Sequence, residues 1–233
     1  MASDWRGFAK RLAAGKMGSR AVDLWRFLEG GSLPLSEFGR ALNADAAAER
    51  CRSDTRVLLG YSMGGRLALH SLLEKTASWQ AAVIISAHPG LEVAAERASR
   101  CVADAGWASK ALAGNWHEFL DAWNRQSLFA GGSMPDSQAS SRLVTRRREI
   151  ARSFIDWSLG VQDPLWNRLH EIDLPVLWVV GENDMKFRAL AERAVAQMAR
   201  ATLAVAPMTG HRVPWEAEAW LASRVLGFLS DGL

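Results

Sequence analysis

Residues 56–66 read Arg-Val-Leu-Leu-Gly-Tyr-Ser-Met-Gly-Gly-Arg, and this stretch indicates the fold more clearly than any other part of the chain. Within it, Gly-x-Ser-x-Gly runs from Gly60 to Gly64, with an apolar run before it and a helical pattern after it. Between a strand and a helix, such a turn strains the serine and lifts its Oγ above the sheet. We therefore predict that Ser62 is a nucleophile on a sharp turn. The amide of Met63, at the helix N-terminus, can donate to an oxyanion.

Five short apolar runs rich in β-branched residues predict buried parallel strands, because most of them lead through a turn into a helical stretch. They are Ser19–Leu24, Arg56–Gly60, Ala82–Ser86, Val176–Val180 and Thr202–Ala206. This alternation indicates an α/β fold with a mostly parallel sheet and helices on both faces. Residues 88–175 show no strand pattern and are too long for a structureless loop. We expect them to form a helical cap inserted into an α/β core of residues 1–87 and 176–233.

The composition is that of one globular domain. The chain has 233 residues, of which 49% are hydrophobic and 23% charged, and its mass of 25.6 kDa is enough for a full core without disulfides. No apolar run approaches the ~20 residues of a membrane span, and the N-terminus has no apolar signal segment. Cys51 and Cys101 read as reduced thiols. These features predict a soluble, cytoplasmic protein with no membrane span.

The charge pattern argues against a nucleic-acid partner. The net charge is only +3, and the basic residues, mostly arginine, are scattered along the chain. The one dense run, Arg146-Arg147-Arg148, is typical of a solvated helix face. Some of the other arginines could present planar forks to carboxylates or phosphates. We predict no metal site and no cofactor, and the sequence leaves the oligomeric state open.

A serine on such a turn needs an acid and a base later in the chain, in the order Ser, Asp or Glu, His. Asp184 follows the fourth predicted strand and is the expected acid, with Glu182 as a competitor two residues earlier. His211 follows the fifth strand and is the expected base, whereas His88 ends the third strand and could shape the pocket. The remaining histidines, His70, His117 and His170, read as surface or packing residues. All three expected catalytic residues lie at the carboxyl ends of strands, where ligands bind in parallel sheets.

Four segments carry a more specific resemblance. Gly-Tyr-Ser-Met-Gly-Gly-Arg (60–66), Ser-Ala-His-Pro-Gly-Leu (86–91), Gly-Glu-Asn-Asp-Met-Lys-Phe (181–187) and Gly210-His211 together resemble the α/β-hydrolase-fold 2-succinyl-6-hydroxy-2,4-cyclohexadiene-1-carboxylate synthases of menaquinone biosynthesis. The likeness extends from about Trp5 to the C-terminus. It implies an α/β-hydrolase fold and a carbon–oxygen lyase. Such an enzyme removes pyruvate from 5-enolpyruvoyl-6-hydroxy-2-succinylcyclohex-3-ene-1-carboxylate.

The resemblance also implies site residues. Ser62, Asp184 and His211 match the family triad, in which the serine, activated by the histidine, abstracts a ring proton instead of attacking an acyl carbon. Positions that match the anion-binding and pocket residues are Arg66, Arg100, Arg142, Tyr61 and Trp123. A small tri-carboxylate substrate would need several arginine forks. Arg97 competes with Arg100 because it lies three residues away on the same helix face, and Trp123 could instead be core of the cap.

One departure from the family concerns the start of the chain. Family members begin with strands that lead to a His-Gly loop, whose amide is the second oxyanion donor. Here Met1–Trp5 resembles the segment just after that loop, so we expect the N-terminal strands of the fold to be missing.

Two other functions stay open. A serine hydrolase of the same fold, a carboxylesterase or carbon–carbon bond hydrolase, would form an acyl-enzyme. A truncated, inactive homologue would serve as a binding module.

Overall fold

The computed structural model describes residues 2–49, 55–129 and 142–232, which form two compact units. The sheet unit comprises residues 35–89 and 165–233, and the helical unit comprises residues 1–34 and 90–164. The expected boundaries differ from this division chiefly at the N-terminus, since the first 34 residues group with the helices and not with the sheet.

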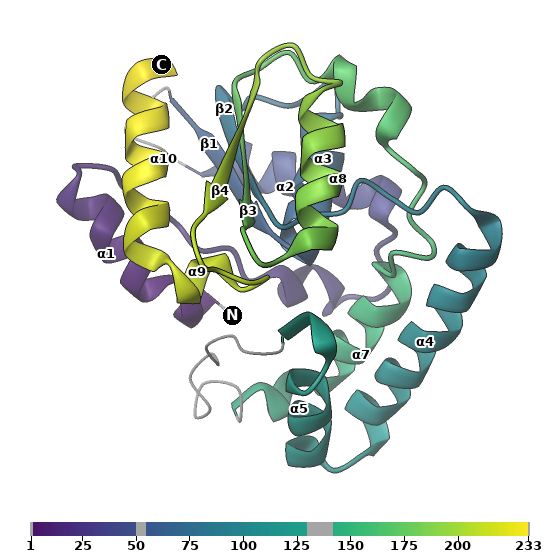
Figure 1. Cartoon of the computed structure of the whole chain (residues 1–233). Coiled ribbons are helices and arrows are strands. Elements are labelled where there is room, and N and C mark those ends of the chain that lie inside the picture. Colours follow the sequence, from purple (N-terminus) through teal and green to yellow (C-terminus); the bar gives the residue numbers. More distant parts are fainter. Residues whose placement is uncertain (1, 50–54, 130–141, 233) are drawn as a thin grey trace. The chain divides into compact units, whose positions relative to one another are not determined.

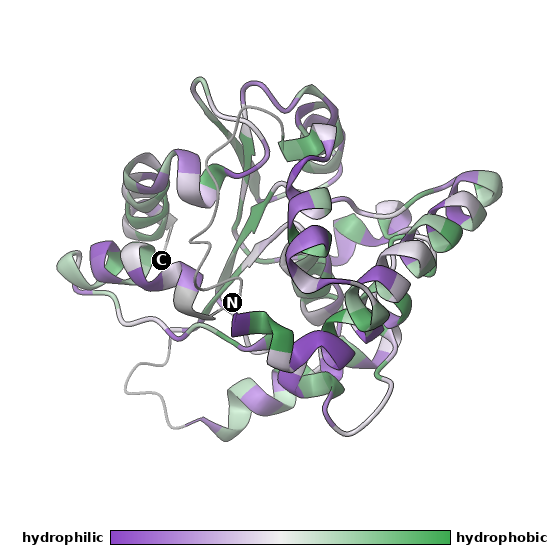
Figure 2. Ribbon diagram, turned by 90° about the horizontal axis from the view of Figure 1, so that it is seen from below, coloured by the Kyte–Doolittle hydropathy of each residue, from purple (hydrophilic) through white to green (hydrophobic). Residues whose placement is uncertain are grey.

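The sheet unit is built on four parallel strands in the order β1-β2-β3-β4. They are β1 (Val57–Tyr61), β2 (Ala81–Ile85), β3 (Val176–Gly181) and β4 (Ala201–Ala206). Every residue of β2 and β3 is buried, as expected for central strands covered on both faces, and Figure 2 colours much of the sheet as hydrophobic. The prediction of a parallel sheet from these four runs is confirmed.

Helices cover both faces of this sheet. The helices of the unit are α2 (Leu35–Ala48), α3 (Met63–Leu72), α8 (Met185–Val195), α9 (Val213–Glu216) and α10 (Glu218–Gly232), with the 3-10 helix η5 at Trp166–Glu171. Figure 1 shows α3 and α8 on one face and α10 on the other. Each crossover returns the chain to the same edge of the sheet, so the carboxyl ends of all four strands meet there.

The helical unit contains helices and no strand among its described residues. Its helices are α1 (Arg6–Ala14), α4 (Ala94–Ala113), α5 (Trp116–Asn124) and α7 (Arg147–Asp156). Short 3-10 helices are η1 (Ala2–Trp5), η2 (Leu24–Leu28), η3 (Ser127–Phe129) and η4 (Arg142–Arg146). The expectation of helical structure between the third and fourth predicted strands is therefore confirmed for residues 88–129 and 142–175. In the part of the chain that the structure describes, no helix is long and apolar enough to cross a bilayer.

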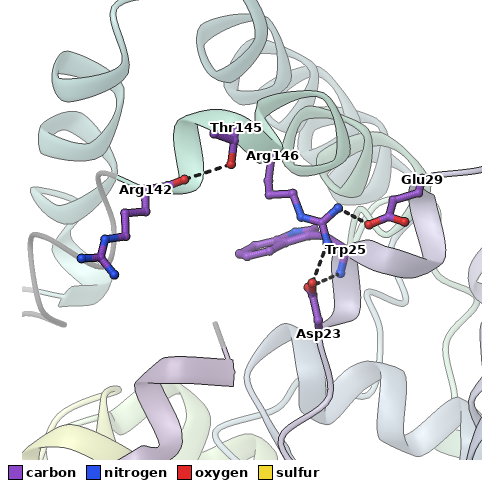
Figure 3. Close-up of polar contacts among 6 residues, drawn as sticks. All are labelled: Asp23, Trp25, Glu29, Arg142, Thr145 and Arg146. Carbon is purple, nitrogen blue, oxygen red and sulfur yellow. Dashed lines mark hydrogen bonds and ion pairs between the residues drawn. The ribbon is translucent and has the colours of Figure 1, made fainter.

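The strand predicted at Ser19–Leu24 is wrong. Asp23 instead starts η2, because its side chain accepts the N–H of Trp25 (3.2 Å). Arg146 then binds Asp23 (2.6 Å) and Glu29 (Figure 3), and these two carboxylates raise the pKa of its guanidinium. A side chain that caps its own backbone competes with strand pairing, so this segment folds beside α7 and not into a sheet.

The arginine run is structural as well as polar. Arg147 donates to the carbonyl oxygens of Ala111 (2.8 Å) and Gly114 (2.6 Å), at the C-terminal end of α4. A cation there satisfies carbonyls that have no partner within the helix. Arg146 binds two carboxylates and Arg147 binds two carbonyl oxygens. The prediction that the arginine run is only a solvated helix face is therefore wrong for Arg146 and Arg147.

The contact between α2 and α3 provides a test of the packing. A Cβ on Gly39 would lie 2.6 Å from the carbonyl oxygen of His70, whereas Gly227 in α10 has open space around the same position. We expect Gly39→Ala to lower the free energy of unfolding by about 1–3 kcal/mol because the backbones must separate. Gly227→Ala should raise it by about 0.5–1 kcal/mol through helix propensity. Urea unfolding of the two variants checks both signs, and equal effects would contradict the close packing of α2 on α3.

Candidate active site

The turn between β1 and α3 has the strained backbone that the sequence predicts. Ser62 has φ 51° and ψ −114°, a conformation that costs energy for any residue with a side chain. Its N–H donates to the carbonyl of Ile85 at the end of β2 (2.8 Å). A Cβ on Gly60 would strike the carbonyl of Gly64, and one on Gly65 would lie 2.7 Å from the Cβ of Ala87. The small residues of the motif are thus required by close approach.

Three side chains meet at this turn in the order of a catalytic triad. His211 Nε2 lies 3.1 Å from Ser62 Oγ, and His211 Nδ1 lies 2.6 Å from Asp184 Oδ2. The side chains of His211 and Asp184 are only 1% and 7% exposed, so water competes little for their hydrogen bond. The structure therefore brings together the three residues expected from sequence, with a geometry that lets His211 take a proton from Ser62.

Two loops place the acid and the base side by side. The N–H groups of Glu182 and Asn183 donate to the carbonyls of Ala206 and Thr209, each at 2.9 Å. These bonds continue the pairing of β3 with β4 beyond the strands. Because the loops are joined by backbone bonds, the distance between Asp184 and His211 is set by strand register and not by the side chains alone.

Glu182 is not the acid that orients the histidine. Its side chain is exposed and accepts the N–H of Met208 (2.7 Å), while Asp184 occupies Nδ1 of His211. The geometry therefore favours Asp184 over its competitor. Glu182 instead supports the turn at Met208, whose φ of 52° is also strained.

Aromatic rings surround the histidine. The rings of Phe187 and Tyr61 lie 4.4 and 5.6 Å from that of His211, and Trp215 packs edge-on against Tyr61 at 5.1 Å. Burial raises the pKa of the Tyr61 hydroxyl, so this pocket-lining candidate stays neutral at physiological pH. The ring of His88 lies 6.4 Å from that of Phe187, and its role in shaping the pocket stays a prediction.

Some residues around the triad were not anticipated. The sequence patterns do not indicate Phe187, Trp215, Arg212 or Glu216 as residues of the site. Phe187 is three residues after Asp184 and Trp215 is four after His211. One helical turn from a catalytic residue is a signal that could have indicated them.

The remaining candidates of the sheet unit lie at the start of α3. Met63 is its first residue, and the first N–H groups of a helix have no intrahelical partner, so its amide is available in principle to an oxyanion. Arg66 is in the first turn and is 7% exposed. Its role as an anion anchor stays a prediction. Across residues 2–49, 55–129 and 142–232, no group of three or more potential ligands is placed to hold a metal ion.

Arg100, Trp123 and Arg142 belong to the helical unit. Arg100 Nε binds Asp104 Oδ2 (2.8 Å), which also accepts the hydroxyl of Ser158 (2.7 Å). Its competitor Arg97 donates to the carbonyl of Gly160 (3.1 Å). Both arginines therefore have structural contacts of their own.

Trp123 and Arg142 differ in their surroundings. Trp123 packs against Trp107, Phe129 and Phe154 at 5.2–5.8 Å, which favours the alternative that it is core of the cap. Arg142 is exposed, and Figure 3 shows its guanidinium pointing away from the ion pairs of Arg146. The substrate contacts of both residues stay predictions.

Comparison with known proteins agrees with this architecture. A model of the alpha/beta hydrolase family matches residues 1–224. A relative from Bacillus subtilis (strain 168) is 32% identical over 179 residues, which are 75% of this chain and 65% of that protein. The 2-succinyl-6-hydroxy-2,4-cyclohexadiene-1-carboxylate synthase of Pectobacterium atrosepticum is 34% identical over 179 residues, 74% of this chain and 68% of that protein. The chain thus spans about two thirds of the length of these relatives.

Solved structures give the same fold. A structure of MenH from S. aureus superposes with a TM-score of 0.84 at 20% identity, covering 99% of this chain and 90% of that one. The enol-lactonase of Burkholderia xenovorans LB400 superposes with a TM-score of 0.65 at 15% identity, covering 98% and 86%. The prediction of an α/β-hydrolase fold is confirmed.

The hydrogen bond between Asp184 and His211 can be tested without a substrate. A short bond from Nδ1–H to a buried carboxylate gives a low-field proton resonance in NMR spectra. We expect Asp184→Asn to remove this resonance, because an amide favours the other imidazole tautomer. Glu182→Gln should keep it, because glutamine still offers an acceptor to Met208. Loss of the resonance in Glu182→Gln alone would reverse the assignment of the acid.

Proposed function

Because the chain belongs to the alpha/beta hydrolase family, and within it to the 2-succinyl-6-hydroxy-2,4-cyclohexadiene-1-carboxylate synthases, we propose that it eliminates pyruvate from 5-enolpyruvoyl-6-hydroxy-2-succinylcyclohex-3-ene-1-carboxylate. The product is 2-succinyl-6-hydroxy-2,4-cyclohexadiene-1-carboxylate, the compound that gives the Pectobacterium relative its name. The observation that supports this most is the contact of His211 with both Ser62 and Asp184.

The bonds that change follow from the chemical structures of the substrate and the product. The substrate ring has a double bond between C3 and C4 and carries the enolpyruvoyl oxygen on C5, whereas the product has double bonds at C2–C3 and C4–C5. Removal of the C2 proton, which the neighbouring succinyl carbonyl acidifies, forms the C2–C3 double bond. The C3–C4 electron pair moves to C4–C5, and the C5–O bond breaks. The enolpyruvate that leaves takes up a proton and becomes pyruvate.

The triad supplies the base for this step. In the proposal, His211 Nε2 takes the proton of Ser62 Oγ, and the resulting oxyanion takes the C2 proton. Asp184 stabilises the imidazolium that forms. The amide of Met63 would donate to the enolate oxygen of the succinyl group as negative charge develops there. His211, now an imidazolium, gives its proton to the departing enolpyruvate, so that Ser62 and His211 return to their starting protonation states.

Recognition of the substrate rests on its carboxylates. The substrate carries three: one on the ring, one on the succinyl arm and one on the enolpyruvoyl group. Arg66 is the anchor that the sheet unit offers, since it lies in the first turn of the helix that begins after Ser62. Arg100 and Arg142 are the proposed anchors of the helical unit. A neutral ester would need none of these cations, and this separates the synthase from a serine hydrolase.

Ser62→Ala tests the role of the serine. We expect it to lower kcat for pyruvate release by about 10²- to 10⁴-fold, the range for loss of a general base. The fold should persist, because alanine fits wherever serine fits. A coupled assay for pyruvate measures the rate, and Ser223→Ala on the exposed side of α10 is the control. Wild-type turnover by Ser62→Ala would refute the triad mechanism.

Arg66 tests the substrate class. Its replacement by alanine would leave a substrate carboxylate without its partner, at a cost of about 2–5 kcal/mol, or roughly 30- to several-thousand-fold in kcat/KM. Lysine should restore activity only in part, because a point charge does not reproduce a bidentate fork. Hydrolysis of p-nitrophenyl acetate, if measurable, should hardly change.

The control for this experiment is Arg224→Ala, an exposed arginine of α10. Equal losses of Arg66→Ala on the charged and the neutral substrate would mean that Arg66 supports the turn and does not bind an anion. Rapid acetate release with no pyruvate formation by the wild type would favour the serine hydrolase instead.

A further inference from the structure

Glu216 touches the backbone of the histidine loop. It is the last residue of α9, five positions after His211, and its Oε2 accepts the N–H of Gly210 at 2.6 Å. This is the short distance of a hydrogen bond with an ionised acceptor. Gly210 directly precedes the catalytic histidine, so the carboxylate acts on the residue that sets the direction of the His211 side chain.

Gly210 is fixed from two sides. A Cβ on Gly210 would lie 3.3 and 3.6 Å from the two oxygens of Glu216, so the carboxylate faces this residue closely. On the other side, a Cβ on Gly181 would strike the Gly210 carbonyl, which therefore lies against the end of β3. The Gly210 carbonyl is therefore packed against Gly181 at the end of β3, and the Gly210 N–H is bound by Glu216.

The charge of Glu216 also has a counterpart. Arg212 begins the turn of α9 and is only 4% exposed, and burial lowers the pKa of its guanidinium while the nearby Glu216 opposes that shift. The N–H of Glu216 donates to the carbonyl of Arg212 (3.0 Å). A buried cation requires compensating negative charge, and Glu216 supplies part of it next to the histidine.

We propose that Glu216 is a positioning residue of the active site. By binding the Gly210 amide and compensating the charge of Arg212, it keeps the loop in the conformation in which His211 reaches both Ser62 and Asp184. The other charged or titratable groups around this loop have separate roles: Tyr61 contacts the imidazole ring, and Glu182 binds Met208. The inference is independent of the substrate, because either base or nucleophilic chemistry needs His211 in this place.

The test compares Glu216→Ala with Glu216→Gln, which keeps an acceptor for the Gly210 amide but has no charge. Glu192→Gln is the matched control, since Glu192 forms an exposed pair with Arg188 on α8. Three measurements are made on each protein: the low-field resonance of the His211–Asp184 hydrogen bond, the rate of fluorophosphonate labelling of Ser62, and kcat and KM for pyruvate release. The first two need no knowledge of the substrate.

We expect Glu216→Ala to broaden or remove the resonance and to slow labelling and kcat by about 10- to 100-fold with little change in KM, because the base is misplaced by a fraction of an ångström. Glu216→Gln should recover the resonance and most of the rate, and Glu192→Gln should match the wild type. If the alanine variant does not fold, an intermediate labelling rate of the glutamine variant still supports the proposal.

Several results would overturn the inference. One is a wild-type resonance and labelling rate in folded Glu216→Ala. When the alanine variant does not fold, the overturning result is a labelling rate of Glu216→Gln equal to that of the wild type. A loss in KM alone would assign Glu216 to substrate binding instead. Absence of pyruvate release from the wild type, with the resonance and labelling pattern as expected, would reject the proposed function while leaving the role of Glu216 intact.

Discussion

The active site depends on the buried hydrogen bond between Asp184 and His211. Neither residue lies in a strand, and 26 residues separate them in sequence. Their 2.6 Å contact exists because β3 and β4 pair in one register and because the loops after them stay joined by backbone hydrogen bonds. A shift of that register by one residue would move the acid by more than 3 Å along the strand. The register of the buried β3 against β4 therefore sets the distance between the two side chains proposed to act in catalysis.

Backbone strain is concentrated at the same edge of the sheet. In the described part of the chain, Ser62, Ser86 and Met208 are three of the four residues other than glycine with positive φ. They follow β1, β2 and β4. Such conformations persist only where the surrounding structure enforces them, and here the pairing of the strands and the packing of α3 do so. In this strained conformation Ser62, the single residue between β1 and α3, places its Oγ 3.1 Å from His211 Nε2.

Much of this arrangement could be predicted from the sequence, because its determinants are local. The turn at Ser62 needs small residues at fixed positions, and β2 and β3 are buried on both faces and so read as continuous apolar runs. The same reliance on local patterns made the strand prediction for Ser19–Leu24 wrong. Its apolar residues suggest a strand, but the ion pair of Asp23 with Arg146 joins residues 123 positions apart, which no local pattern reveals.

The details of the site were harder to predict. The sequence favours Asp184 over Glu182 because of its position in the turn after β3. It does not indicate the contact of Glu182 with Met208, because these residues lie in the separate loops after β3 and β4. No sequence pattern indicates Glu216, because its contact with Gly210 depends on how α9 turns back. Arg100 matched a family position and pairs with Asp104 four residues later on the same helix, whereas the bond from Ser158 to that buried carboxylate joins residues 54 positions apart. Contacts that cross elements thus account for most of what the sequence did not indicate.

The central claim is that Ser62 and His211 remove a ring proton and do not form an acyl-enzyme. The most direct measurement is the single-turnover rate of pyruvate release from substrate that carries deuterium at C2. If proton abstraction breaks the C2–H bond in the first chemical step, the deuterated substrate must react more slowly than the protiated one. Equal single-turnover rates, together with a covalent adduct on Ser62 in the mass spectrum of the protein, would contradict the account.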